Sequence, residues 1–322
     1  MEPIRVVSLD DYQDVTRRFG PWDELGDRVE LVTVTEHLAD RAALVERLQG
    51  AAVVLAMRER TVFDRDLLAS LPDLRLLVTK GTWNAAIDLE AADDLGIVVS
   101  GTHNASDPTA ELTWALILAL CKHVVSEDRA VRDGGWQRSI GRELAGATLG
   151  VVGLGNLGTK VARVGQAFGM EVIAWSQNLR PEAAADVGVR AVPKETLLRT
   201  ADIVTIHLKL SARTRGIIGA AEIDHLQPTA LLVNTSRGPL VDEEALRSAL
   251  HAGAIAGAGI DVYETEPLPV DHPWRSTPNT VLTPHVGYVT EEGYRHHFTQ
   301  AVEGIAAWLD GAPIRVLRPA SD

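Results

Sequence analysis

The sequence predicts an α/β fold with two parallel sheets, and three observations support this prediction. The chain has 322 residues, which suggests two domains. Short apolar segments alternate with segments of helical spacing in two separate series, a pattern typical of βαβ units. Most of the apolar segments are continuous, as expected for strands that helices cover on both faces. Hydrophobic residues make up 46% of the chain and charged residues 23%, so we expect a substantial core.

The first series occupies the N-terminal third of the chain. "IRVVSL" at residues 4–9 is short, apolar and β-branched, as buried strands are. Residues 39–50 show the apolar spacing of a helix and end at a glycine. By the same criteria we expect further strands at 29–34, 51–57, 74–80 and 97–102, and short helices at 64–71 and 88–96.

One long helix is expected between the two series, at residues 107–133. Asp107 can cap its N-terminus, Pro108 suits its first turn, and the pair Gly134-Gly135 ends it. The middle of this helix is apolar on nearly all sides, so we expect it to be buried between domains or subunits.

The second series begins at residue 148 and resembles the first in its alternation of strands and helices. Strands are expected at 148–153, 171–175, 202–208, 230–235, 256–263 and 280–285, and a final helix at 294–309. No Ser- or Pro-rich linker is visible, so the joints between domains should be short, near 101–106 and 287–291.

Charge and composition argue against several classes of protein. The net charge is −13, whereas nucleic acids and anionic membranes require clustered positive charge. Cys121 is the only cysteine, so no intrachain disulfide can form, and it lies in an apolar run that is too short to span a bilayer. The N-terminus lacks the pattern of a signal peptide. We therefore expect a cytoplasmic protein in which Cys121 is a core residue.

No metal site is expected, because no metal-ligand spacing is visible. His296 and His297 are adjacent on a helix and therefore point to different faces.

A glycine motif predicts a dinucleotide site. Gly153, Gly155 and Gly158 have the spacing G-x-G-x-x-G, between an expected strand and an expected helix. The first glycine permits a tight turn, the second lets the backbone approach a pyrophosphate, and the third lets the helix pack closely on the strand. The pyrophosphate would lie at the positive end of that helix.

An acidic residue that usually follows this motif is missing. It normally lies about 20 residues further on, where it binds the ribose hydroxyls of NAD and repels a 2′-phosphate. Here that position falls at Ser176, followed by Gln177 and Asn178, and the nearest cation is Arg180. This neutral cluster with an arginine nearby would tolerate or bind a 2′-phosphate. We expect an NAD(P) cofactor, with NADP(H) slightly favoured over NAD(H).

Ionisable residues follow three strands of the second series. Arg237 follows the strand at 230–235, and His285 ends the strand at 280–285. Asp261, Glu264 and Glu266 lie at the end of the strand between them. These ends share the rim of the glycine loop, where ligands bind in open α/β sheets. A guanidinium can hold a carboxylate, and a histidine paired with a carboxylate can exchange a proton during hydride transfer. These patterns do not distinguish Glu264 from Glu266 as the partner.

Taken together, these segments resemble the D-isomer-specific 2-hydroxyacid dehydrogenase family, which includes phosphoglycerate dehydrogenase, glyoxylate/hydroxypyruvate reductase, D-lactate dehydrogenase and formate dehydrogenase. The resemblance covers nearly the whole chain and rests on "VVGLGNLGTKVARVGQAFGMEVIAWS", "LVNTSRGPLVDEEAL", "GAGIDVYETEPLP" and "LTPHVGY". It implies that Arg237 orients a 2-oxo acid, that His285 is the acid/base, and that Glu266 pairs with His285.

The resemblance also implies a domain order and a set of cofactor contacts. A Rossmann domain at 103–288 is inserted into a flavodoxin-like substrate domain formed by 1–102 and 289–322. The long helix commonly builds a dimer contact in such proteins, so we expect a homodimer. Cofactor contacts are expected at Gly153, Gly155, Asn156, Leu157, Gly158, Ser176, Gln177, Asn178, Arg180, His207, Thr235, Ser236, Asp261 and Gly287.

The expected substrate loop departs from the family pattern. Where the family has a segment such as "AGVGVDNID", this chain has "TKGTWNAAID", with Lys80, Gly81, Thr82 and Trp83. Lys80 adds a cation and Trp83 adds bulk, which suggests a second anionic group or an unusual side chain on the substrate. Alternatively, Lys80 is solvated and Trp83 packs in the cleft between domains.

The resemblance favours an NAD(P)-dependent oxidoreductase that transfers a hydride between NAD(P)H and C2 of a 2-oxo acid or D-2-hydroxy acid. A dinucleotide-sensing protein, similar to corepressors on this fold, is one alternative. A formate- or phosphite-type dehydrogenase is another. Replacing His285 would abolish turnover in an enzyme, whereas the effect of a sensor would survive.

Overall fold

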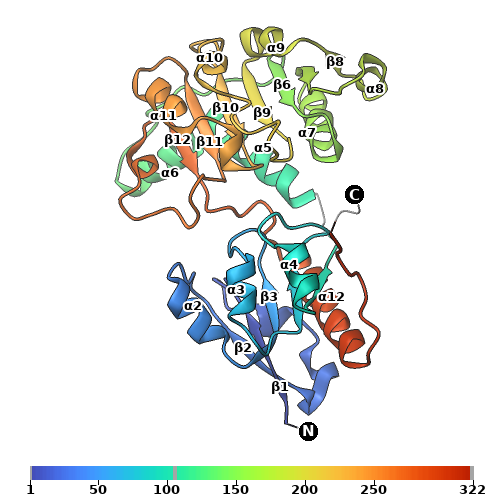
Figure 1. Ribbon diagram of the computed structural model, residues 1–322. Helices are drawn as coiled ribbons and strands as arrows, with labels where there is room; N and C mark the ends of the chain where they lie inside the picture. The colour runs from blue at the N-terminus through green and yellow to red at the C-terminus, as the bar shows by residue number, and fades with distance from the viewer. Residues whose placement is uncertain (1, 104–106, 320–322) are drawn as a thin grey trace. The chain divides into compact units, whose positions relative to one another are not determined.

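The computed structural model describes residues 2–103 and 107–319. The chain forms two compact units, Met1–Ala105 with Val289–Asp322, and Ser106–Tyr288. The second unit is therefore inserted into the first, and the final helix α12 (Glu291–Leu309) belongs to the first unit (Figure 1).

The first unit contains a five-stranded parallel sheet with the order β2-β1-β3-β4-β5. This is the flavodoxin-like order. All five expected strands form, slightly shorter than predicted: β1 (Ile4–Ser8), β2 (Val29–Thr33), β3 (Ala51–Ala56), β4 (Leu76–Thr79) and β5 (Val98–Gly101).

Helices cover both faces of this sheet, which explains why most residues of its strands are apolar. On one face, strand residues such as Val54 and Leu77 pack against α2 (Arg41–Leu48), α3 (Arg65–Ala69) and α4 (Leu89–Asp94). An aspartate caps the N-terminus of each of these helices, as Asp40 does for α2. The helix α12 contacts β4, the short helix α1 (Thr16–Phe19) and the 3₁₀ helix η1 (Trp22–Arg28).

The second unit contains a seven-stranded parallel sheet with the order β12-β11-β10-β9-β6-β7-β8. All strands are parallel, and their order continues outward on both sides of the β6–β9 pair, as in a Rossmann fold. The strands are β6 (Thr148–Val152), β7 (Glu171–Trp175), β8 (Arg190–Ala191), β9 (Ile203–Ile206), β10 (Leu231–Asn234), β11 (Gly257–Ile260) and β12 (Thr280–Leu282). The α/β fold with two parallel sheets is therefore confirmed.

Helices also cover both faces of the second sheet. One buried cluster joins the sheet to α5 (Asp107–Cys121), α7 (Asn156–Ala167) and α8 (Pro181–Ala185). The cluster on the other face contains α9 (Lys194–Thr200), α10 (Ala220–Ile223) and α11 (Glu243–His251). Short 3₁₀ helices, η2 (Gly238–Leu240) and η3 (Pro273–Ser276), lie in the connections beyond β10 and β11.

The prediction of one long helix at 107–133 is wrong. The segment forms two helices, α5 and α6 (Val124–Arg132), whose axes differ by 61°. The break lies at His123, which has a left-handed φ of +54°, and the Cys121 carbonyl accepts a hydrogen bond from the Arg142 backbone N–H (2.8 Å). A residue distant in sequence thus ends α5, which helical spacing does not reveal. The predicted capping by the Asp107 side chain lies outside the described side chains.

No single helix in the described part of the chain is long and apolar enough to cross a membrane. The bent pair α5–α6 meets the criteria of length and composition only when its two helices are taken together. Within the second unit, α5 buries Trp114, Leu116 and Ile117 in the core.

Candidate active site

The glycine loop connects β6 to α7, and its first and third glycines are required by close contacts. Gly153 has a φ of +102°, and a Cβ atom at this residue would lie 2.6 Å from the His207 carbonyl oxygen. A Cβ atom at Gly158 would lie 2.0 Å from the Gly153 carbonyl oxygen. These contacts hold the loop against the end of β9, at the point where the strand order reverses.

The second glycine faces open space, as a site for a bound group requires. A Cβ atom at Gly155 would meet no atom within 4 Å. Gly155 is the N-cap of the 12-residue helix α7, whose first turn has no acidic residue and no side-chain cap. The amides near Asn156 and Leu157 therefore lie at a positive helix end whose first turn carries no acidic residue. This geometry fits the pyrophosphate of a nicotinamide dinucleotide.

The end of β7 presents polar residues beside the glycine loop, as the sequence predicts. The Gly153 backbone N–H donates a hydrogen bond to the Trp175 carbonyl (2.8 Å), and Ser176 follows Trp175 half-buried. Gln177 is exposed, and its Nε2 donates to the carbonyl of Arg213 (3.3 Å).

Two arginines, Arg180 and Arg213, lie on segments close to this end of β7. Arg180 and Asn178 are exposed, and Arg180 occupies the N-cap position of α8. Arg213 is also exposed, on the loop that Gln177 contacts. Sequence reasoning did not identify Arg213, because its proximity to β7 depends on a loop that follows a different strand.

His207 follows β9 and is neutral. Its Nε2 forms a hydrogen bond with the Thr205 hydroxyl (2.9 Å), whereas its Nδ1 is buried and has no hydrogen-bond partner among the described residues. Burial lowers the pKa of His207 to about 3.

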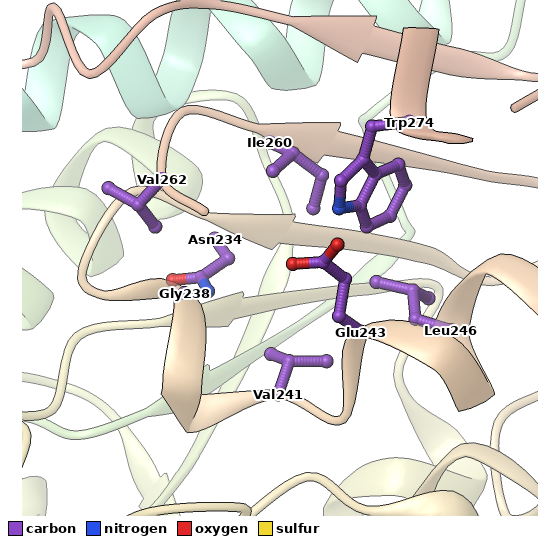
Figure 2. Close-up of a pocket in the computed structure, with 8 residues that line it drawn as sticks. All are labelled: Asn234, Gly238, Val241, Glu243, Leu246, Ile260, Val262 and Trp274. Carbon is purple, nitrogen blue, oxygen red and sulfur yellow. The ribbon is translucent and has the colours of Figure 1, made fainter. Parts of the chain in front are cut away.

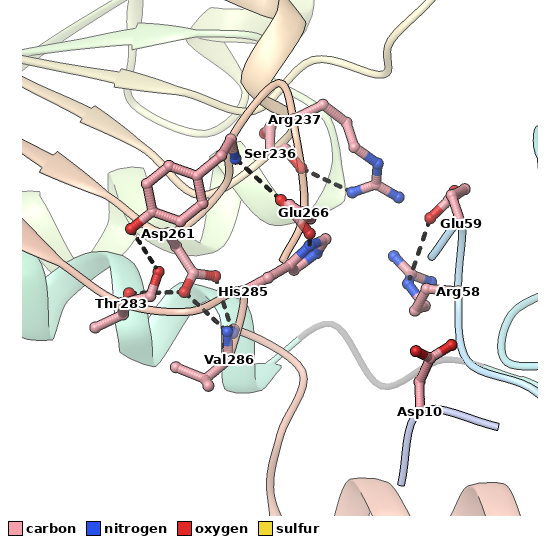
Figure 3. Close-up of polar contacts among 12 residues, drawn as sticks. Asp10, Arg58, Glu59, Ser236, Arg237, Asp261, Glu266, Thr283, His285 and Val286 are labelled. Carbon is pink, nitrogen blue, oxygen red and sulfur yellow. Dashed lines mark hydrogen bonds and ion pairs between the residues drawn. The ribbon is translucent and has the colours of Figure 1, made fainter. Parts of the chain in front are cut away.

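His285 and Glu266 form the closest ionisable pair of this region (Figure 3). The Nδ1 atom of His285 lies 2.5 Å from Oε2 of Glu266, and both side chains are largely buried. The other oxygen of Glu266 accepts a hydrogen bond from the Tyr263 backbone N–H (2.9 Å). Glu264, the alternative partner, instead lies 3.7 Å from Arg215. The contact with Glu266 assigns the hydrogen to Nδ1 and leaves Nε2 of His285 available for proton exchange.

Asp261 holds the backbone that carries His285 (Figure 3). Its Oδ1 accepts hydrogen bonds from the Thr283 hydroxyl (2.7 Å) and the Val286 N–H (2.8 Å). Its Oδ2 accepts from the Gly287 N–H (3.0 Å). Burial raises the pKa of Asp261, and these donors oppose that rise. The Asp261 carboxylate is fully buried, and its role is to hold the backbone that follows β12.

Arg237 is presented by a turn that Asn234 organises. The Asn234 side chain accepts from the Ser236 N–H (3.0 Å) and donates to the Arg237 carbonyl (2.9 Å). The Ser236 hydroxyl donates to the Ile206 carbonyl (2.7 Å), and the Thr235 hydroxyl bonds to that of Thr113 (2.8 Å). The hydroxyls of both candidate cofactor residues, Thr235 and Ser236, are thus engaged within the unit.

In the first unit, the predicted substrate loop follows β4, and Lys80 is not solvated. Lys80 is 4% exposed, its Nζ donates to the Gly293 carbonyl (3.2 Å), and it lies 5.0 Å from the centre of the Tyr294 ring. Burial, together with Arg58 and Arg60, lowers the pKa of Lys80 to about 7.

The rest of this loop is partly exposed. Gly81 has a φ of +112°, and its N–H donates to the Thr102 hydroxyl (3.3 Å). Thr82 is exposed and Trp83 is 58% exposed, whereas Asn84 is buried and donates to the carbonyl of Arg58 (2.6 Å).

Sequence reasoning missed the residues that follow β3 in the same unit. Arg58 has a left-handed φ of +58°, and its Nε lies 4.0 Å from Glu59 (Figure 3). Arg60 lies over the ring of Tyr12, 4.8 Å from its centre. The ends of β3 and β4 thus bring three cations to one edge of the sheet. The signal was available in "MRERT", because this segment directly follows an expected strand.

Within the described part of the chain, no three His, Cys, Asp or Glu side chains are grouped as metal ligands. His297 instead bonds to the Thr102 hydroxyl through Nδ1 (3.0 Å).

The chain is similar to known dehydrogenases in sequence. Residues 114–287 match a family model described as "D-isomer specific 2-hydroxyacid dehydrogenase, NAD binding domain". A glyoxylate reductase from Aeropyrum pernix is 42% identical over 258 residues, which cover 77% of this chain and 77% of that protein. A D-3-phosphoglycerate dehydrogenase from Archaeoglobus fulgidus is 35% identical over 81% of this chain, but the match covers only 50% of that protein.

The similarity extends to solved structures. A phosphoglycerate oxidoreductase from Vibrio cholerae superposes with a TM-score of 0.92 at 34% identity, covering 96% of this chain and 100% of that chain.

Proposed function

The chain belongs to the D-isomer specific 2-hydroxyacid dehydrogenase family, and we propose that it reduces a small 2-oxo acid to the D-2-hydroxy acid with His285 as proton donor. The family supports NAD-linked reductase activity and a nicotinamide dinucleotide cofactor. The observation that carries the assignment of His285 is its 2.5 Å contact with Glu266, at the rim that also presents Arg237 and the glycine loop.

The proposed chemistry divides between the cofactor and the side chains. A nicotinamide dinucleotide held at the glycine loop would supply hydride-transfer chemistry toward C2 of the oxo acid. His285 gives the proton on Nε2 to the carbonyl oxygen, and Glu266 stabilises the imidazolium before transfer. Arg237 binds the carboxylate and carbonyl oxygen of the substrate through its guanidinium. In the reverse direction, neutral His285 takes the hydroxyl proton.

We assign the unit Ser106–Tyr288 to the cofactor and the other unit to the substrate, following the predicted division at 102/103 and 288/289. In the substrate unit, the N–H groups of Thr82 and Trp83 would bind the substrate carboxylate, whereas the Gly81 N–H already donates to the Thr102 hydroxyl. Lys80, with Arg58 and Arg60 beside it, favours a substrate that carries a further anionic group.

NADP(H) is the cofactor we favour. A carboxylate at position 176 would repel a 2′-phosphate, whereas Ser176 can donate a hydrogen bond to it. Arg180 and Arg213 are exposed cations on the two segments that Gln177 connects. The ratio of kcat/KM for NADPH over NADH should exceed one, and Arg180→Ala should lower it about tenfold or more. A wild-type preference for NADH would contradict this assignment.

The test of the reaction uses glyoxylate and hydroxypyruvate with NADPH and NADH. We expect turnover, and we expect His285→Gln to lower kcat at least about 100-fold. His251→Gln, which changes an exposed histidine of α11, is the matched control and should leave kcat unchanged. Binding of cofactor without turnover on any 2-oxo acid would contradict the proposal and favour a sensing role.

We also propose a homodimer. Val124, Val125 and Val131 of α6 are each more than half exposed, and Trp136 and Ile140 beyond it are 76% and 93% exposed. Apolar side chains that gather in this way mark an interaction surface. Light scattering should give twice the mass of the chain, and Ile140→Asp combined with Trp136→Arg should give monomers.

A cytoplasmic location is the last part of the proposal. It is supported by Cys121, a buried free thiol whose pKa burial raises. Retention of the native protein in the soluble cytosolic fraction of fractionated cells would test it.

A further inference from the structure

Glu243 lies in the first turn of α11 and lines a small cavity behind the rim of the candidate active site (Figure 2). Its side chain is 16% exposed. Its Oε1 lies 3.2 Å from Nε2 of His272, and its Oε2 accepts a hydrogen bond from the backbone N–H of Glu264 (3.4 Å). One carboxylate thus contacts two points of the chain that are eight residues apart.

These two points bracket the segment that carries Glu266. Residues 264–272 contain no helix or strand, so no ladder of backbone hydrogen bonds holds them. His272, at the end of the segment, also accepts the Trp274 N–H through Nδ1 (3.3 Å) and so caps η3. Nδ1 is then an acceptor, so a neutral His272 carries its hydrogen on Nε2, which lies 3.2 Å from Oε1 of Glu243.

The start of the segment rests directly on the turn that carries Arg237. A Cβ atom at Gly238 would lie 2.1 Å from the Tyr263 carbonyl carbon and 2.5 Å from the Glu264 nitrogen. Movement of the Glu264 backbone would therefore change the positions of both Glu266 and Arg237. Glu243 fixes that backbone through its contact with the Glu264 N–H.

The cavity is lined mainly by apolar side chains, and the Glu243 carboxylate lies among them. Figure 2 shows its carboxylate facing the indole of Trp274. Trp274 is 2% exposed, and its Nε1 has no hydrogen-bond partner among the described residues.

We propose that Glu243 is a positioning residue that holds the Glu266 carboxylate against His285 by tying both ends of the segment 264–272 to α11. The inference rests on the proposed function, in which Glu266 and His285 transfer the proton. A carboxylate is required because both contacts come from donors. Glutamine at this position has one acceptor oxygen and an amide that donates, so Glu243→Gln can keep only one of the two contacts.

The test combines kinetics with NMR of the His285 ring. We expect Glu243→Gln to lower kcat about tenfold, the loss of one hydrogen bond to a charged group, with a smaller rise in KM for the 2-oxo acid because the Arg237 turn rests on Glu264. The downfield resonance of the His285 Nδ1 proton, which reports the contact with Glu266, should move upfield or disappear. Glu244→Gln, an exposed neighbour in the same helical turn, is the matched control and should change neither quantity.

Several outcomes would overturn the proposal. They are an unchanged resonance in folded Glu243→Gln, an equal effect of Glu244→Gln, or absence of the downfield resonance in the wild type. If Glu243→Gln does not fold, His272→Asn decides, because asparagine can still cap η3 while the contact with Glu243 is lost. An upfield movement supports the proposal and an unchanged resonance overturns it. If the wild type shows no turnover but the resonance responds to Glu243→Gln, the proposed function fails and the positioning role stands.

Discussion

Replacing Lys80 with Met should stabilise the protein while weakening the binding of anionic substrates. Lys80 is buried beneath α12, and burial, together with Arg58 and Arg60, disfavours its charged form. The fall of its pKa from 10.5 to about 7 corresponds to a penalty of about 5 kcal/mol on the ammonium group, at about 1.36 kcal/mol per pH unit.

That figure is an upper limit for the gain, because methionine also loses two favourable contacts. The ammonium group donates to the Gly293 carbonyl and lies over the Tyr294 ring. A hydrogen bond from a charged group contributes about 1.5–3 kcal/mol and a partly desolvated cation–π contact about 1 kcal/mol. We therefore expect Lys80→Met to raise the free energy of unfolding by about 1–2 kcal/mol near neutral pH.

The pH dependence distinguishes this mechanism from ordinary improvement of packing. The pKa of Lys80 is lower in the folded than in the unfolded state, so the penalty is complete below about pH 7 and is relieved as the pH rises towards 10.5. Urea unfolding at pH 6, 7.5 and 9 should give a stabilisation that is largest at pH 6. Lys122→Met, at an exposed lysine, is the control and should show no such trend.

Two results would refute the reasoning. A stabilisation that grows with pH would show that Lys80 is not penalised as a cation. Unchanged KM values across a panel of mono- and dianionic 2-oxo acids would show that the buried cation has no part in substrate binding, and the lysine would then need another explanation.

Three further predictions follow from the second unit. Gly158→Ala should prevent folding or abolish cofactor binding, because a Cβ atom at this residue has no space. Gly155→Ala should fold and only raise the Kd for the cofactor. Equal unfolding temperatures for the two variants would contradict this prediction. Asp261→Asn should lower the free energy of unfolding, measured in urea, by about 2–4 kcal/mol. The three donors bind both carboxylate oxygens, and the amide nitrogen of asparagine cannot accept a hydrogen bond. A decrease below about 1 kcal/mol would be inconsistent with these contacts. The pKa of His207 is lowered from 6.5 to about 3, so stability that is complete above about pH 6.5 should fall with decreasing pH by up to about 1.4 kcal/mol per unit, and His207→Gln should reduce this slope.

The strands were predictable from the sequence because their signal is local. Central strands of the first unit such as β3 are continuous apolar runs whose faces are buried by helices, so the run itself carries the information. The helices of the second unit beyond α7 were not predicted individually, and the two-residue strand β8 was missed. Short elements such as β8 carry too few residues for a period to be recognised.

The residues that decide the chemistry were less predictable, because their state depends on contacts that are distant in sequence. The strand-end pattern does not distinguish Glu264 from Glu266 as the partner of His285. In the folded segment, Glu266 lies 2.5 Å from His285, whereas Glu264 lies near Arg215. Lys80 could be interpreted as solvated, because the helix that covers it begins more than 200 residues later. The prediction of one helix through Cys121 was wrong for a similar reason, because the contact of the Cys121 carbonyl with the Arg142 N–H is not visible in the local helical spacing.

His285 shows how one strand end can determine the position of a reactive side chain. Its backbone has a left-handed φ of +53°, which is unfavourable for a residue other than glycine and persists only where surrounding contacts impose it. Those contacts come from the segment after β11: the Asp261 carbonyl accepts the His285 N–H (2.7 Å), and the Asp261 carboxylate binds the two N–H groups that follow. Glu266, on the same segment, binds the imidazole. The backbone is held through Asp261 and the ring through Glu266, so a displacement of Glu266 relative to Asp261 changes the direction of Nε2. This coupling explains why a contact such as that of Glu243, which touches neither His285 nor its loop, should still influence proton transfer.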